Sequence, residues 1–149
     1  MRLVIQRVSN AKVEVNQQVI GEIGQGLLVL IGIEDADTME DLSWCVKKLI
    51  GMRIFSDEDG KMNLSIKEVD GGVLAISQFT LHASTKKGNR PSFIKAGKPD
   101  FAQKMYQEFI RLLNLEIDQV EQGEFGANMQ VSLCNDGPVT ITMDSKNKE

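Results

Sequence analysis

The sequence predicts an α+β domain in which a strand-rich, barrel-like or bent sheet is covered by two main helices. Three observations predict this class. The first third alternates apolar and polar residues, two internal segments repeat apolar residues at helical spacing, and the last quarter returns to strand-forming residues. A length of 149 residues fits one domain, residues 1–149, with a core of its own.

The first third is expected to form a β-meander. "RLVIQRV" and "AKVEV" alternate apolar and polar residues as half-buried strands do. Residues 16–18 predict a turn, and "VIGEI" after them predicts another strand. The run "GLLVLIGI", residues 26–33, is apolar throughout and predicts a central strand.

Two helices are expected. The first follows a cap at Asp37 or Thr38, and residues 42–49 place apolar side chains at helical spacing. The second runs from about residue 99 to residue 113, with Pro99 in its first turn. Each apolar stripe is expected to face the sheet.

The remaining segments predict strands and turns. "SDEDGK", residues 56–61, is an acidic turn that lacks the full ligand spacing of a calcium loop. Residues 71–81 predict a strand opened by two glycines, residues 129–135 and 139–144 predict the last two strands, and residues 145–149 predict a frayed tail. Gly137–Pro138 falls between the last two strands, where a paired strand tolerates proline least.

The composition excludes several classes of protein. No apolar run approaches the ~20 residues of a membrane helix, and the N-terminus lacks a signal peptide, which predicts a cytoplasmic protein. Cys45 and Cys134 belong to no metal-binding motif and are expected to be reduced, mostly buried thiols. With His82 as the one histidine, no metal and no cofactor are expected.

The charge is unevenly distributed. A net charge of −4 argues against a general nucleic-acid binder. Residues 84–98 nevertheless carry five cations and no acid: Lys86, Lys87, Arg90, Lys95 and Lys98. This segment is either a solvated loop or a local contact for phosphate groups.

The common catalytic motifs are missing from the sequence. There is no G-x-S-x-G, no P-loop and no G-x-G-x-x-G. Two polar stretches, residues 77–80 and 135–138, interrupt otherwise apolar strands. A strand end followed by a loop exposes backbone N–H groups that can form an oxyanion hole. The alternative is that Ser77 and Thr80 only satisfy the end of a strand.

In combination, these stretches resemble a known family. "SQFTLHA", the Lys- and Arg-bearing loop with "RPSF" after it, and the late "NDGPVT" resemble D-aminoacyl-tRNA deacylase, as do the opening "MRLVIQRVSNAKVEV" and the "GLLVLIGI" strand. The resemblance implies a homodimer with a barrel-like α+β fold. It also implies hydrolysis of the ester between a D-amino acid and the terminal adenosine of tRNA, and removal of glycine misplaced on tRNA.

The resemblance also assigns site residues. It places four residues in the catalytic site: Ser77, Gln78, Phe79 and Thr80. It makes Gly137 and Pro138 a Gly-cisPro pair that reaches into the partner subunit's site and excludes L-amino acids. The expected adenosine pocket comprises Ala102, Phe125 and Met129, and the expected contacts to tRNA phosphates are Lys86, Lys87 and Arg90.

Some alternatives stay open at this point. Sequence alone predicts a trans Gly137–Pro138 bond, because only about 5–6% of X-Pro bonds in folded proteins are cis. Attack by water aided by the ribose 2′-hydroxyl and attack by Thr80 are both compatible with the motifs. A non-catalytic RNA- or nucleotide-binding module is a second function, although 5% aromatic residues offer little for base stacking. A thiol esterase using Cys134 is a third.

Overall fold

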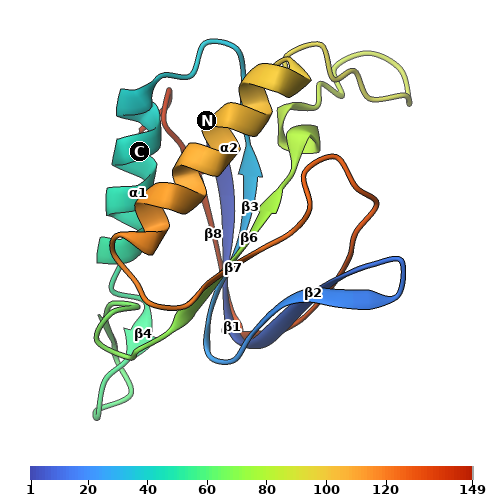
Figure 1. Ribbon diagram of the computed structural model, residues 1–149. Helices are drawn as coiled ribbons and strands as arrows, with labels where there is room; N and C mark the ends of the chain where they lie inside the picture. The colour runs from blue at the N-terminus through green and yellow to red at the C-terminus, as the bar shows by residue number, and fades with distance from the viewer. Residues whose placement is uncertain (149) are drawn as a thin grey trace.

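The structure is a computed structural model that describes residues 1–148. Helices α1 (Met39–Gly51) and α2 (Pro99–Asn114) lie beside each other on one face of a strongly bent, nearly closed sheet (Figure 1). The strands are β1 (Arg2–Val15), β2 (Gln18–Ile23), β3 (Gly26–Gly32), β4 (Phe55–Ser56), β5 (Met62–Leu64), β6 (Gly72–Ser77), β7 (Val120–Gln122) and β8 (Gln130–Asp144). The predicted α+β class with two covering helices is confirmed.

The predicted meander is wrong. The strands of the main sheet are ordered β2-β1-β3-β6-β7, and β8 also pairs with β1. Residues 2–8 of β1 pair with β3, and residues 11–15 pair with β2, both antiparallel. β1 is 14 residues long, so two shorter strands fit along one of its edges. β3 therefore returns beside the start of β1 and not beside β2.

The apolar pattern of β3 follows from burial on both of its faces. Leu27, Val29 and Ile31 belong to the core beneath the helices, while Leu28 belongs to a second, smaller cluster on the other side of the sheet. β6 pairs with β3 in parallel and is likewise buried on both faces. A strand covered on both faces has no solvent-facing positions, so its sequence shows no alternation.

The helices begin as their sequences predict. Thr38 is the N-cap of α1, and the Thr38 and Asp41 side chains form a capping box with the backbone N–H groups of both residues. Pro99 is in the first turn of α2, where a missing backbone N–H costs nothing. The face of α1 that includes Leu42, Cys45 and Leu49 is buried.

The acidic turn at residues 56–61 joins β4 to β5, and within residues 1–148 no three His, Cys, Asp or Glu side chains gather as metal ligands. No helix in this part of the chain is long and apolar enough to cross a bilayer.

Burial raises the pKa of the Cys45 thiol to about 12. Cys134 is exposed, so the expectation of mostly buried thiols is wrong for this residue, which lies on the outer side of β8.

β6 ends earlier than the sequence predicts. A 3-10 turn, η1 (Phe79–His82), replaces the expected last residues of the strand. The Gln78 N–H donates to the Ile31 carbonyl at 2.7 Å, and η1 then packs directly against β3 at Gly32. A Cβ at Gly32 would lie 2.9 Å from Leu81 Cβ, so this close packing requires glycine.

The two expected final strands are a single strand, β8, with a bulge. Thr140 pairs with Gln6, whereas Asn135 pairs with Val8, so the residues between Asn135 and Thr140 leave the ladder. The bulge contains Gly137–Pro138, whose peptide bond is cis, so the trans bond predicted from X-Pro frequencies is wrong and the cis bond implied by the resemblance is present. A proline that would break a paired strand is thus placed where no ladder hydrogen bond is lost.

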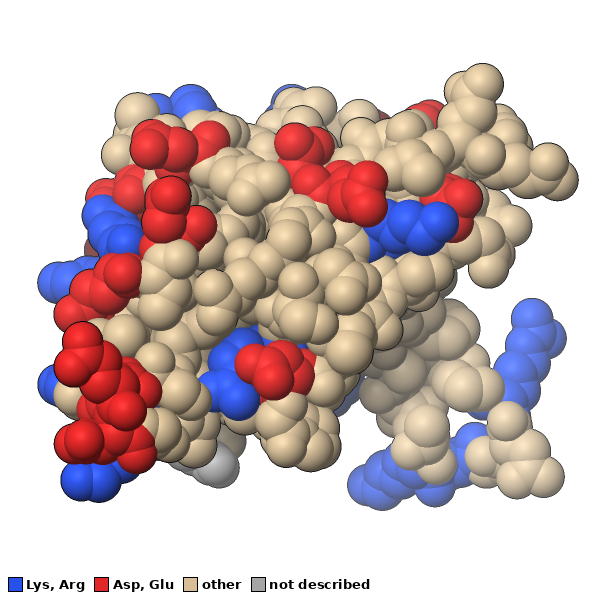
Figure 2. Space-filling model, turned by 90° about the horizontal axis from the view of Figure 1, so that it is seen from below, with Lys and Arg blue, Asp and Glu red and all other residues tan. Residues whose placement is uncertain are grey.

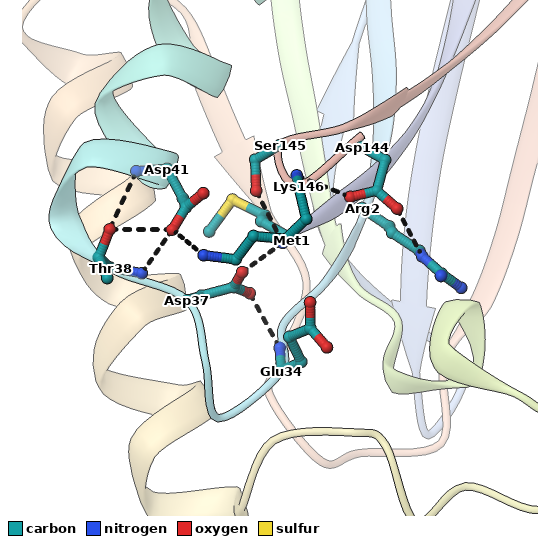
Figure 3. A network of polar contacts seen from close by, with 9 residues as sticks. All are labelled: Met1, Arg2, Glu34, Asp37, Thr38, Asp41, Asp144, Ser145 and Lys146. Carbon is teal, nitrogen blue, oxygen red and sulfur yellow. Dashed lines mark hydrogen bonds and ion pairs between the residues drawn. The ribbon is translucent and has the colours of Figure 1, made fainter. Parts of the chain in front are cut away.

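A polar network joins both ends of the chain to the start of α1 (Figure 3). The Met1 ammonium group pairs with the Asp37 carboxylate and donates to Ser145 Oγ at 2.9 Å. Asp37 also accepts the Glu34 N–H at 2.9 Å. The expectation of a frayed tail is therefore wrong for Ser145, which is buried, and for the residue after it, while residue 149 lies outside the described residues.

That residue, Lys146, pairs with Asp41 at 2.6 Å in a site where the Asp41 side chain is 9% exposed. Burial by itself would raise the pKa of Asp41. Hydrogen bonds from Lys146, Ser145 and Thr38 outweigh it and hold the pKa well below its usual value of 3.8. Asp41 is thus both a cap of α1 and the anchor of the C-terminal segment.

We predict that Asp41→Asn lowers the free energy of unfolding at pH 7 by about 1.5–3 kcal/mol, because it removes hydrogen bonds to a charged group. A depressed folded-state pKa contributes stability that is complete above the unfolded value of 3.8 and is lost as pH falls through the folded value. The difference between wild type and variant should therefore shrink below about pH 4. Urea unfolding between pH 7 and pH 2 measures it.

Asp59→Asn is the matched control, since the Asp59 side chain is 79% exposed. This change should alter stability little at any pH. A difference between wild type and Asp41→Asn that stays constant down to pH 2 would contradict the role given to the Asp41 carboxylate.

Candidate functional site

The site lies where β3 and β6 end side by side. Ile31 of β3 pairs with Ser77, the last residue of β6, and η1 follows at once. A cavity of about 480 Å³ opens at this end of the sheet. It is lined by six of the residues that the sequence predicts for the site: Ser77, Gln78, Phe79, Ala102, Phe125 and Met129. Three separate segments of the chain thus meet around one hollow.

Sequence reasoning missed the small residues of the cavity wall. Ala96, Gly97 and Pro99, at the entry to α2, also line it. The Gly97 N–H donates to the Ile33 carbonyl at 2.8 Å, and a Cβ at Gly97 would lie 3.2 Å from that oxygen. The available signal was the small-residue run "AGKP" just before the helix, which places α2 close to the end of β3.

The wall at Phe125 and Met129 is supported from behind. The Tyr106 ring lies 6.0 Å from the Phe125 ring, centroid to centroid, and its hydroxyl donates to the Ala75 carbonyl at 2.9 Å. Burial raises the pKa of Tyr106 well above its usual range. A Cβ at Gly123 would lie 2.5 Å from Met129 Sδ. Glycine at this position therefore leaves room for the methionine.

Within residues 1–148, no side chain that could act as a base hydrogen-bonds to Thr80. Gln78 Nε2 donates to Thr80 Oγ1 at 2.6 Å, and an amide N–H takes no proton from a hydroxyl. Thr80 does not itself line the cavity, whereas its neighbours Gln78 and Phe79 do. The backbone N–H groups of Phe79 and Thr80 lie at the start of η1, where a helical turn supplies no acceptor of its own, and the loop and turn hydrogen bonds of residues 1–148 include neither of them.

A Cys–His pair is not assembled. His82 is 1% exposed, and its Nε2 has no hydrogen-bond partner among residues 1–148. Cys134 is exposed on β8, opposite Asn10. The two side chains share no hydrogen bond in the described part of the chain, so the structure offers no support for a thiol esterase.

Gly137 and Pro138 lie outside the cavity of their own chain, in the exposed bulge of β8. The buried Arg7 holds this bulge. Arg7 Nε donates to the Asp136 carbonyl and also contacts the Asp136 carboxylate, each at 3.2 Å. Arg7 Nη1 donates to the Ile54 carbonyl at 2.6 Å.

Gly137 itself has no room for a side chain. Its φ is +122°, and a Cβ would lie 2.9 Å from Arg7 Nη2. On the other side of the bulge, Asn135 Oδ1 accepts the Val139 N–H at 3.1 Å, and Asn135 Nδ2 donates to Thr140 Oγ1 at 2.9 Å. The bulge is thus fixed in shape and presented to solvent.

Residues 84–92 of the basic segment form an arm beside the cavity. Ser84 and Ser92 exchange backbone hydrogen bonds of 2.8 and 3.0 Å, which close the base of the arm. Beyond them lie the exposed Lys86, Lys87 and Arg90, and the ion pairs of residues 1–148 include none of the three. At the end of the molecule where Figure 1 places this arm, Figure 2 shows Lys and Arg side chains without acidic neighbours.

Known proteins resemble the whole chain. Residues 4–144 match the family model described as D-Tyr-tRNA(Tyr) deacylase. The chain is 60% identical to a protein of Flavobacterium johnsoniae and 61% identical to one of Akkermansia muciniphila, each over the full length of both chains. Both relatives are named D-aminoacyl-tRNA deacylase.

Two solved structures share the fold. The structure named c-Myc DNA Unwinding Element Binding Protein is 39% identical, with a TM-score of 0.92 over 97% of this chain and 98% of that one. A probable eukaryotic D-amino acid tRNA deacylase is 20% identical, with a TM-score of 0.82 over 95% of this chain and 97% of that one, and this likeness shows the fold alone. From the family match and the full-length identities, the chain belongs to the D-Tyr-tRNA(Tyr) deacylase family.

Proposed function

We propose that the chain, acting as one cytoplasmic domain, hydrolyses the ester that joins a D-amino acid to the 3′-terminal adenosine of tRNA. This reaction is a chirality-proofreading step in translation. The observation that carries the proposal is the cavity that gathers Ser77, Gln78 and Phe79 with Ala102, Phe125 and Met129. The relatives named D-aminoacyl-tRNA deacylase support it, because they match over the full chain.

The cavity suits the adenosine end of the substrate. Its volume of about 480 Å³ falls in the range of small-molecule sites, which is roughly 300–1,000 Å³. Phe125, whose ring packs against Tyr106, supplies an aromatic side chain for the base, and Ala102 and Met129 add apolar surface to the cavity wall. Bound there, the adenosine would bring its ester to the start of η1.

The chemistry then relies on positioning. Water attacks the ester carbonyl, the backbone N–H groups of Phe79 and Thr80 hold the oxyanion, and the ester C–O bond breaks as the ribose oxygen regains a proton. One such donor is typically worth about 3–4 kcal/mol. The neighbouring 2′-hydroxyl of the ribose assists the water. Thr80 acts through its position, since the Gln78 amide is the one group among residues 1–148 that hydrogen-bonds to its side-chain oxygen.

Selection against L-amino acids is assigned to Gly137 and Pro138 of a second copy. The bulge that bears them is exposed, fixed by Arg7 and outside its own cavity, as expected for a group that acts on a partner. A wall at that place blocks an L side chain and leaves room for a D side chain. Glycine carries only hydrogens on that carbon and should pass.

A homodimer is part of this proposal. Val4 pairs with Leu30 on one side and Thr142 on the other, on the sheet face opposite Leu3 and Ile5 of the helix-side core. Val4 and Leu30 are only half-buried in a single chain. A second copy laid on this face would cover them.

The alternative is nucleic-acid binding without turnover. A solved structure that is 39% identical carries the name of a DNA-binding protein, and the basic arm suits either function. The cavity favours the deacylase, because a binding surface for nucleic acid needs no hollow lined by a strand end and a 3-10 turn. Binding of tRNA with no release of amino acid would select the alternative.

We predict that the protein releases D-tyrosine from D-tyrosyl-tRNA and glycine from glycyl-tRNA, and that it cleaves L-tyrosyl-tRNA at least about 100-fold more slowly. The reason is that the proposed wall blocks only a side-chain carbon that is attached in the L configuration, and neither a D-amino acid nor glycine has a carbon at that place. Acid-precipitable radioactivity from the three labelled tRNAs measures the rates. Glycyl-tRNA left intact where D-tyrosyl-tRNA is cleared would contradict the wall and favour a pocket that binds the D side chain.

Two variants and one measurement of mass control this experiment. Gly137→Ala should reduce cleavage of D-tyrosyl-tRNA, because a Cβ there meets Arg7 and the φ is +122°. Gly24→Ala has no atom within 4 Å of the new Cβ and should keep full activity. Because the wall comes from a second copy, activity should fall at concentrations where light scattering finds only the 16.5 kDa monomer.

We predict that Thr80→Ala lowers kcat by about 2- to 10-fold, the effect of losing one hydrogen bond. A covalent nucleophile would cost orders of magnitude when removed. Single-turnover kinetics measure the loss, and mass spectrometry of acid-quenched enzyme looks for an aminoacyl adduct. An adduct on Thr80 would overturn the proposed role.

We predict that replacing Lys86, Lys87 and Arg90 together with Ala raises KM for D-tyrosyl-tRNA and leaves KM for a short D-tyrosyl-adenosine ester unchanged. The arm should contact phosphates that the short ester lacks, so the salt dependence of KM should also weaken. Replacing the exposed Lys47 and Lys48 on α1 is the matched control and should change neither KM. Equal effects of the arm variant on both substrates would show that the arm does not touch the RNA.

A further inference from the structure

Two exposed aromatic rings connect the basic arm to the cavity. Phe79 of η1 lines the cavity and is 57% exposed, and Phe93, just beyond the arm, is 39% exposed. Their ring centroids are 5.2 Å apart with an interplanar angle of 72°, an edge-to-face pair. Phe93 does not line the cavity among residues 1–148, so its contact with the site runs through Phe79.

The backbone holds Phe93 between two fixed points. On one side, the pair of hydrogen bonds between Ser84 and Ser92 closes the arm directly before it. On the other, the Ala96 N–H donates to the Phe93 carbonyl at 3.0 Å, and the Gly97 N–H donates to the Ile33 carbonyl at 2.8 Å. A displacement of the arm should therefore reach Phe93 before it reaches Ala96 and Gly97 of the cavity wall.

We infer that Phe93 is a positioning residue: it holds the Phe79 ring at the rim of the cavity and couples binding at the basic arm to the catalytic turn. The inference rests on the proposed deacylase function. Phe79 starts η1, so its ring orientation and its backbone N–H belong to the same turn. An unsupported Phe79 ring would leave that N–H less well aimed at the developing oxyanion.

The kinetic test compares Phe93→Ala with Phe93→Tyr. Phe93→Ala should lower kcat about 3- to 10-fold on both D-tyrosyl-tRNA and the short D-tyrosyl-adenosine ester, with KM for the short ester changed less than about twofold. Phe93→Tyr keeps the ring edge and should restore kcat. Ile94→Ala removes a neighbouring side chain that is 93% exposed and should leave kcat on the short ester unchanged.

Several outcomes would overturn the inference. A normal kcat for Phe93→Ala, a change confined to KM on whole tRNA, or a Phe93→Tyr variant as slow as Phe93→Ala would each do so. Melting temperatures within about 2 °C of wild type exclude misfolding of a variant. A wild-type protein that cleaves none of the substrates would instead refute the proposed function. In that case the coupling between the arm and Phe79 is tested by a measurement that needs no turnover.

That measurement uses fluorine resonances. With 4-fluorophenylalanine in place of the six phenylalanines, the Phe79 signal is assigned from its loss in Phe79→Leu. An RNA hairpin that carries an acceptor stem but no 3′ adenosine can occupy the arm without filling the cavity. It should shift the Phe79 signal in wild type and leave it in place in Phe93→Ala. No shift in wild type, or the same shift in both proteins, would overturn the coupling.

Discussion

Pairing along both edges of β1 is the constraint on which the rest of the structure depends. One edge of this strand holds β3 and β2 in succession, and the other holds β8 along nearly its whole length. Every backbone polar group of a buried strand needs a partner, so β1 fixes the place of three other strands. The Met1–Asp37 ion pair and the Ser145 contact then lock the start of β1 and the end of β8 to the helix layer.

The candidate site follows from this arrangement. With one edge of β3 taken by β1, the other edge pairs with β6 in parallel, and the ends of two parallel strands point the same way. The last residues of β6 therefore emerge at a common edge, where η1, the start of α2 and the β7–β8 connection meet around the cavity. The bulge in β8 is also fixed in place, but its Gly137 and Pro138 are exposed and do not line the cavity of their own chain.

The sequence predicted best those features that depend on neighbouring residues in the chain. The cap of α1, the start of α2 at Pro99 and the apolar strand β3 depend on a residue and its near neighbours. The last two were predicted, and the cap was predicted at Asp37 or Thr38, of which the structure selects Thr38. The meander, the continuous β6 and the split β8 were wrong, because strand order and strand ends depend on partners far away in the chain. The site residues around "SQFT" came from a resemblance. Ala96 and Gly97 were missed because the run "AGKP" shows a close approach of the chain but not which part of the chain it approaches.

The sequence by itself determined the α+β class, the two helices and the family motifs, because propensity, periodicity and short motifs depend on residues that are close together in the sequence. Only the tertiary structure decided that β1 is shared by three strands, that Ala102, Phe125 and Met129 meet Ser77 around one cavity, and that Gly137 lies outside it. It also decided that Phe93 touches Phe79. Such contacts join residues far apart in the chain, and their geometry is set by which strand edges and helix faces remain free to pack.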